Sequence, residues 1–159
     1  VSMNHREAQQ IINQSAERAL EQGQELSRGQ SQWCGQAREA SAVASLVASL
    51  LGRPVVVRAG AEGAYFARPA AVSAEVPAAA SANAADVTYI PTPRVAAIDT
   101  NGAGDAHSGV LAAALAQAIP LERAFLLANC AGALSTTLVG PAVCPSREQI
   151  EAAADALAD

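Results

Sequence analysis

The residues best suited to chemistry form the stretch Asp99-Thr100-Asn101-Gly102-Ala103-Gly104-Asp105. Apolar residues precede it and an alanine-rich run follows it, which predicts a strand, a turn and a helix. The first N–H groups of a helix have no partner within the helix and lie at the positive end of its dipole. A glycine-rich helix entry therefore predicts an anion site. Asp105 would lie in the first turn, where its carboxylate could accept a hydroxyl proton.

The composition predicts the kind of scaffold that positions this turn. The chain has 159 residues, of which 51% are hydrophobic and only 3% aromatic. A core of Ala, Val, Leu and Ile is typical of buried parallel strands and packed helices, so we expect an α/β fold. The length suits one domain with a proper core, so we expect residues 1–159 to form a single domain.

Periodicity and breakers divide the chain into elements. The expected strands are residues 1–3, 54–58, 64–67 and 94–98, with residues 71–76 as an edge strand. The expected helices are residues 4–22, 37–51, 103–117, 120–139 and 146–158. Gly52 should cap the second helix, and Ser146 with Gln149 should cap the last one.

Several residues allow two interpretations. Asn4 and Glu7 have the spacing of a capping box, or they could face hydrated Mg²⁺ and phosphates. The spacing of Gly60 and Gly63 suits a tight turn or a phosphate site. Asn129, within a helix, is either a solvated residue or a ligand contact.

Other functions are disfavoured by charge and composition. A net charge of -5 without a basic run argues against nucleic-acid binding. No uninterrupted apolar stretch is long enough to span a membrane, and we expect a soluble, cytoplasmic protein. Cys34, Cys130 and Cys144 are too widely spaced for a structural zinc site, and we expect reduced, mostly buried thiols. Trp33 is expected to pack a loop on the core.

Taken together, the motifs resemble the C-terminal half of the ribokinase-like, or PfkB, family of carbohydrate kinases. The segment 99–105 is close to the family's Asp-Thr-x-Gly-Ala-Gly-Asp signature, and Asn4-x-x-Glu7 to its Asn-x-x-Glu element. Gly60-x-x-Gly63 resembles the nucleotide-side turn, and Asn129 with Gly140-Pro141-Ala142 the helix and glycine loop near the adenine. The resemblance implies a three-layer αβα fold with a mixed, mostly parallel sheet, present here as its C-terminal portion.

The resemblance also implies roles for individual residues. Asp105 would be the base that accepts the proton of a sugar hydroxyl as it attacks ATP, and the amides of Gly102, Ala103 and Gly104 would form the anion hole. Mg²⁺ would be reached through water from Glu7, and Asp99 would help to hold a monovalent cation such as K⁺. The remaining nucleotide-side residues would be Asn4, Arg58, Gly60, Gly63, Asn129 and Gly140.

At two positions the sequence departs from the family pattern, so the roles of these residues allow alternatives. Arg58 stands where a small or hydroxyl residue is common, so it could clamp a phosphate or be surface charge. His107, where an aromatic residue is common, is interpreted as a packing or substrate-rim residue.

The family's N-terminal half and lid are not in these residues, so we expect nucleotide affinity at best, and no sugar phosphorylation, from this portion alone. A homodimer of the full-length protein is compatible with the resemblance. The competing hypothesis is a non-catalytic nucleotide-binding module. A dinucleotide-binding Rossmann unit is disfavoured, because the third glycine and its acidic partner are missing.

Overall fold

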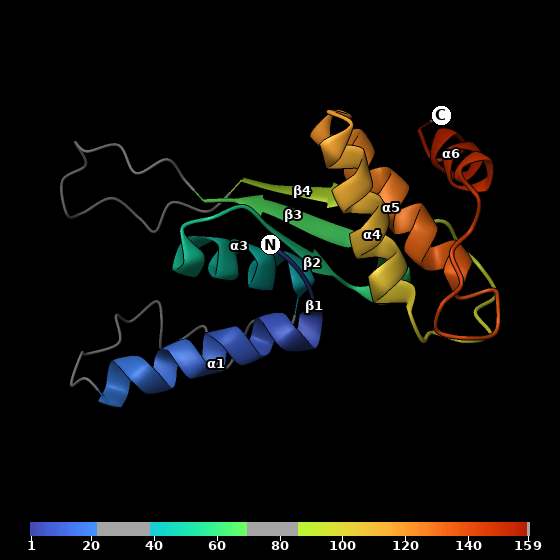
Figure 1. The fold of residues 1–159 in the computed structure, drawn as a ribbon. Helices are drawn as coiled ribbons and strands as arrows, with labels where there is room; N and C mark the ends of the chain where they lie inside the picture. The colour runs from blue at the N-terminus through green and yellow to red at the C-terminus, as the bar shows by residue number, and fades with distance from the viewer. Residues whose placement is uncertain (22–38, 70–85, 159) are drawn as a thin grey trace. The chain divides into compact units, whose positions relative to one another are not determined.

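The computed structural model describes residues 1–21, 39–69 and 86–158. They contain both helices and strands, so the expected α/β class is confirmed (Figure 1). The chain divides into two compact units. One consists of Val1–Ala59 with Tyr65–Tyr89, and the other of Gly60–Ala64 with Ile90–Asp159. Each unit has a buried apolar cluster of its own.

Four strands form one mixed sheet. Their order is β1 (Ser2–Asn4), β2 (Val55–Arg58), β3 (Ala64–Arg68) and β4 (Asp86–Ile90). β1 and β2 are parallel, with Asn4 opposite Arg58. Residues 59–63 join β2 to β3, and such a short link cannot make a parallel crossover, so these two strands are antiparallel. The β-branched run Val55–Val57 is fully buried, as expected for a central strand.

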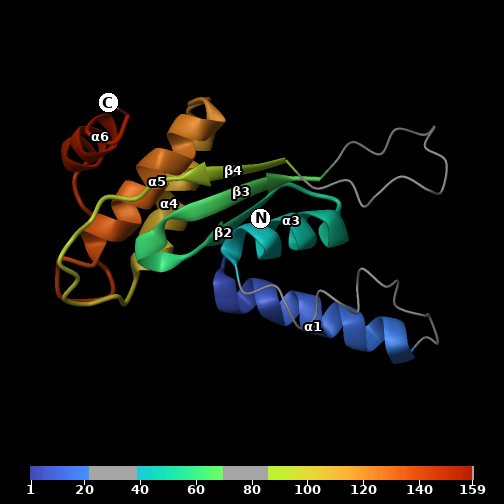
Figure 2. The same cartoon turned by 180° about the vertical axis from the view of Figure 1, so that it is seen from behind.

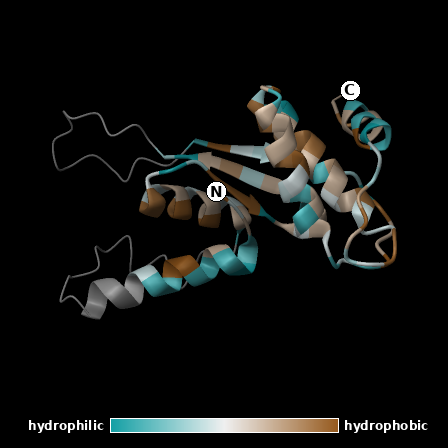
Figure 3. Ribbon diagram, viewed as in Figure 1, coloured by the Kyte–Doolittle hydropathy of each residue, from teal (hydrophilic) through white to brown (hydrophobic). Residues whose placement is uncertain are grey.

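Helices α1 (His5–Glu21) and α3 (Ala40–Leu51) belong to the first unit and lie side by side (Figures 1 and 2). Figure 3 shows that α3 is mainly hydrophobic, whereas the coloured part of α1 is largely hydrophilic with an apolar patch. The buried faces of both helices join the strands in one core, which includes Met3, Ile12, Val43, Val47, Val55 and Val57. Gly52 ends α3 in the left-handed conformation, with φ at 59°, and its N–H donates to the Ala48 carbonyl, which confirms the expected cap.

The second unit contains helices α4 (Ala103–Ala116), α5 (Leu121–Ser135) and α6 (Arg147–Asp155). α4 and α5 approach closely at Gly132, where an added Cβ would lie 3.1 Å from the Ala103 carbonyl oxygen. α5 and α6 are tied by an ion pair of 2.5 Å between Arg123 and Asp155. The expected capping box of Ser146 and Gln149 is present at the start of α6.

The structure differs from the expected elements in several places. Residues 94–98 do not form a strand. Pro91 and Pro93 restrict the preceding backbone, and the amides of Ile98 and Asp99 donate to the carbonyl of Thr136 rather than to a ladder. Helix α5 ends at Ser135, not near residue 139. The hydroxyls of residues 135–137 donate to carbonyls three positions earlier, which favours termination of the helix there. Strand β4 was not expected.

Some expectations lie outside the described residues, namely Trp33, Cys34 and the edge strand at 71–76. Cys130 is buried and burial raises the pKa of its thiol to about 11, whereas Cys144 is exposed, so the expectation of mostly buried thiols stays a prediction. Among the helices that the structure describes, none is long and apolar enough to cross a membrane.

Candidate active site

The turn before α4 has the geometry of an anion site. Gly102 is the N-cap residue, with φ at 77°, and its carbonyl accepts the Ala106 N–H at 2.9 Å. The Ala103 N–H makes only a long bond of 3.4 Å to the Thr100 carbonyl. Among the described residues, no acceptor bonds to the amides of Gly104 and Asp105. These donors are therefore available to a ligand at the positive end of the helix dipole.

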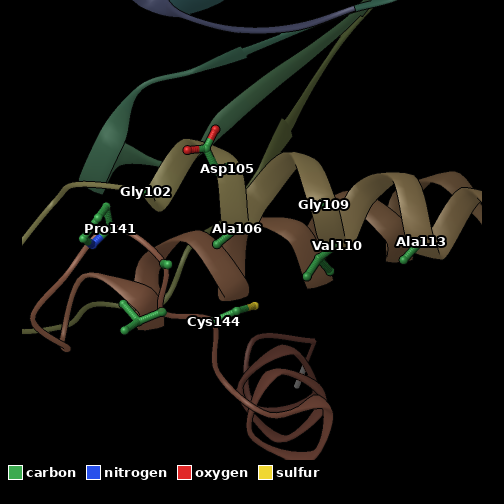
Figure 4. A pocket seen from close by; sticks show the side chains of 10 residues that line it. Gly102, Asp105, Ala106, Gly109, Val110, Ala113, Pro141 and Cys144 are labelled. Carbon is green, nitrogen blue, oxygen red and sulfur yellow. The ribbon is translucent and has the colours of Figure 1, made fainter.

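Asp105 is exposed in the first turn of α4, beside these amides. Figure 4 shows its carboxylate on the opposite side of α4 from the side chains of Ala106 and Val110. The exposed carboxylate is therefore not covered by the residues that line the opposite side of the helix.

A cavity of about 320 Å³ lies along α4, but it is not built around the Asp105 carboxylate. Residues 141–144 form its other wall, and Cys144 points into it together with Ala106 and Val110 (Figure 4). The lining is mainly apolar. Asp105 is among the lining residues, but its carboxylate lies on the other side of α4 from the side chains of Ala106 and Val110 (Figure 4).

Asp99 joins the turn to the loop that follows α5. One carboxylate oxygen accepts the Asn101 N–H at 3.0 Å, and the other accepts the Gly140 N–H at 3.0 Å. These backbone hydrogen bonds, first from Asn101 and then from Gly140, hold the pKa of the Asp99 carboxyl below its usual value. Asp99, Gly102–Asp105 and Gly140 are thus brought together in the second unit.

In the first unit, Asn4, Glu7 and Arg58 meet at the carboxyl end of two parallel strands, the edge at which α/β sheets usually bind ligands. The Asn4 N–H donates to Glu7 at 2.8 Å and the Glu7 N–H donates to Asn4 Oδ1 at 2.9 Å, so the capping box is present. The other Glu7 carboxylate oxygen makes no hydrogen bond within the described residues. The buried Nε of Arg58 likewise lacks a partner among them.

Gly60 and Gly63 form a tight turn directly after β2. Gly60 begins the short 3₁₀ helix η1 (Gly60–Glu62), and the Gly63 N–H donates to the Gly60 carbonyl at 3.2 Å. Their φ angles are 61° and 99°, values that other residues rarely adopt. Glycine is therefore needed here for the backbone conformation, whether or not a phosphate binds.

Asn129 is buried, with only 6% of its surface exposed, and holds the end of β4 and the residue that follows it. Its side-chain amide donates to the carbonyls of Ile90 at 3.0 Å and Pro91 at 2.9 Å. Neither sequence interpretation of Asn129, a solvated residue or a ligand contact, includes this role. In the sequence, the only sign of this role was a polar residue in the interior of an otherwise apolar helix.

His107 is buried on α4, 2% exposed, and its Cβ faces Gly132 of α5. Of its two expected roles, packing is the one that the structure shows. Thr136 also supports the turn but carries no sequence signal, because it acts through its backbone carbonyl. Pro141, which packs against Gly102, lies in the segment Gly140-Pro141-Ala142 that the sequence had singled out.

No group of three or more His, Cys, Asp or Glu side chains in the described ranges could hold a metal directly. The free oxygen of Glu7 fits an indirect contact with Mg²⁺, which usually keeps several water ligands.

Comparison with solved structures shows the same fold in several kinases. Ribokinase from Thermotoga maritima is 24% identical, with a TM-score of 0.61 over 95% of this chain and 40% of that one. A nucleoside kinase from Burkholderia thailandensis in complex with inosine is 21% identical, with a TM-score of 0.61 over 98% and 39%. Phosphofructokinase-2 from Escherichia coli in complex with potassium is 21% identical, with a TM-score of 0.58 over 100% and 41%.

The chain thus spans about two fifths of the length of these proteins. No curated protein is significantly similar to it in sequence. The model of the pfkB family of carbohydrate kinases matches residues 1–148, most of the chain. The chain therefore belongs to the pfkB carbohydrate kinase family and has its ribokinase-like fold.

Proposed function

We propose that the protein is an ATP-dependent phosphotransferase that acts on a hydroxyl of a sugar or nucleoside. The observation that carries this proposal is Asp105 in the first turn of α4, directly beside the unbonded amides of Gly104 and Asp105 itself. Membership of the carbohydrate kinase family supports it. The nucleoside kinase with inosine bound supports a nucleoside as one acceptor class.

In this proposal, the acceptor oxygen attacks the γ-phosphorus of ATP and a new O–P bond forms. The bond from the γ-phosphorus to the bridging oxygen breaks, ADP leaves, and the hydroxyl proton passes to the Asp105 carboxylate. The amides of Gly102, Ala103 and Gly104 would stabilise the charge on the transferring phosphoryl group, the main requirement of such reactions.

The other expected residues complete the proposal. Asn4, Arg58, Gly60, Gly63, Asn129 and Gly140 would contribute to the nucleotide side. Glu7 would contact Mg²⁺ through water, and bound Mg²⁺ would neutralise phosphate charge. A monovalent cation beside Asp99 is supported by the potassium-bound relative. A cytoplasmic location and a homodimer stay predictions.

The test is Asp105→Asn in the full gene product, with Asp155→Asn as the matched control. Asp155 lies at the end of α6 and pairs with Arg123, so its loss should leave turnover unchanged. Asp105→Asn should lower kcat by about 10²- to 10⁴-fold, the usual contribution of a general base, while ATP affinity stays close to wild type. Near-normal turnover would contradict the base assignment. ATP binding without turnover in the wild-type protein would favour a non-catalytic module.

A further inference from the structure

The turn at residues 99–105, here called the anion turn, is held by a second segment far away in sequence. This segment, residues 136–141, is called the supporting loop. The Thr136 carbonyl accepts two amides of the incoming backbone, from Ile98 at 2.7 Å and from Asp99 at 3.1 Å. The start of the anion turn is therefore fixed by the end of α5.

Asp99 makes the next connection. Its Oδ1 accepts the Asn101 N–H within the anion turn, and its Oδ2 accepts the Gly140 N–H of the supporting loop, both at 3.0 Å. One carboxylate thus bonds to an amide of each segment. Only a side chain with two acceptor oxygens can do this while donating nothing.

Gly102 then packs directly against the supporting loop. A Cβ added at Gly102 would lie only 2.0 Å from the Pro141 carbonyl oxygen. The backbone at the N-cap of α4 therefore packs against Pro141. Pro141 directly follows Gly140, whose N–H donates to Asp99. The N-cap of α4 is thus in close backbone contact with the supporting loop.

We infer that Asp99 is a positioning residue that holds the anion turn against the supporting loop through the amides of Asn101 and Gly140. This inference rests on the proposed function and adds a residue that acts through the anion hole without touching substrate. It is a separate role from that of a cation ligand, and the two are compatible, because each carboxylate oxygen that accepts one amide keeps a further lone pair. A nearby cation would be an addition to this arrangement.

The test is Asp99→Asn in the full gene product, with Asp155→Asn as the matched carboxylate-to-amide control. Asparagine keeps one acceptor oxygen, so one of the two amides would face an N–H₂ donor. We expect kcat to fall roughly 10- to 100-fold, since a misplacement of about 1 Å can cost ~10²-fold, with a smaller change in KM for ATP. Amide exchange followed by NMR should become faster at Asn101 or Gly140. The control should change neither quantity.

Two further measurements separate the explanations. Raising the potassium concentration should not restore kcat of Asp99→Asn, and restoration would overturn the inference in favour of a cation ligand. If Asp99→Asn does not fold, Asp99→Ser, which also keeps one acceptor, carries the test. Wild-type kcat and unchanged exchange at both amides, in whichever variant folds, would overturn the inference.

The inference and the proposed function can fail separately. If the wild-type protein transfers no phosphate, the proposed function fails, and the exchange of the Asn101 and Gly140 amides still decides whether Asp99 holds the turn. If the wild-type protein is active and Asp99→Asn has normal kcat and normal exchange, only the inference fails.

Discussion

At the scale of single residues, the anion turn depends on a glycine that nothing else can replace. Gly102 has a φ of 77° and no room for a Cβ, because the Pro141 carbonyl oxygen would be 2.0 Å away. We expect Gly102→Ala to lower the free energy of unfolding by about 2 kcal/mol or more, from backbone strain together with the clash. Urea unfolding followed by circular dichroism would measure the change.

Gly109 provides the matched control for this prediction. It lies within the same helix, and a Cβ there would meet nothing within 4 Å. Gly109→Ala should therefore raise the free energy of unfolding by about 0.5–1 kcal/mol, the usual gain from alanine in a helix interior. Equal effects of the two substitutions would contradict the proposed constraint at Gly102.

The roles of single residues could be predicted from the sequence where their hydrogen-bond partners are close by in the chain. The capping boxes of Asn4 with Glu7 and of Ser146 with Gln149 follow from spacing alone, because each pair is made within one helical turn. The bonds of Asp99 to Gly140 and of Asn129 to Ile90 join positions about 40 residues apart. No local pattern specifies such partners, so these roles required the structure.

At the scale of elements, Asn129 fastens the end of β4 and the residue that follows it to helix α5. Its side-chain amide donates to two carbonyls, those of Ile90 and Pro91, inside a buried site. In Asn129→Asp a carboxylate would face these two acceptors, and we expect a loss of about 2–3 kcal/mol in the free energy of unfolding. Asn13→Asp is the control, since Asn13 is exposed and accepts a bond through Oδ1, which Asp retains. A loss in Asn129→Asp no larger than in the control would contradict the role.

Helix ends with a glycine or hydroxyl cap were predictable, whereas elements defined by distant partners were not. Gly52 and Ser146 mark the end of α3 and the start of α6 as expected. The segment 94–98 has strand-like residues, but the amides of Ile98 and Asp99 bond to the Thr136 carbonyl. Strand β4 carries no clear pattern, because most of its residues are not buried on either face. Propensity is overridden by tertiary contacts in both cases.

At the scale of the whole molecule, the chain holds groups suited to the phosphate side of a kinase but corresponds to about two fifths of each solved relative. The proposed base and anion hole lie at the start of α4, and the proposed Mg²⁺ contact at the start of α1. Among the residues assigned a role in the described part of the chain, only Asp105 would meet the phosphate acceptor, and only at its reacting hydroxyl. Nucleotide binding and acceptor binding should therefore be separable.

We expect residues 1–159 expressed alone to bind Mg²⁺–ATP but not to phosphorylate a pentose or a nucleoside. Phosphoryl transfer needs the acceptor hydroxyl held in line, about 3–3.5 Å from the γ-phosphorus, and water kept out. A base and an anion hole supply neither condition by themselves. Calorimetric titration with a non-hydrolysable ATP analogue and a coupled ADP-release assay would measure binding and turnover, with circular dichroism to verify the fold. The full gene product, with any sequence that flanks these residues, is the positive control. Acceptor-dependent turnover by residues 1–159 alone would show that acceptor recognition also lies within them, and would contradict the separation argued here.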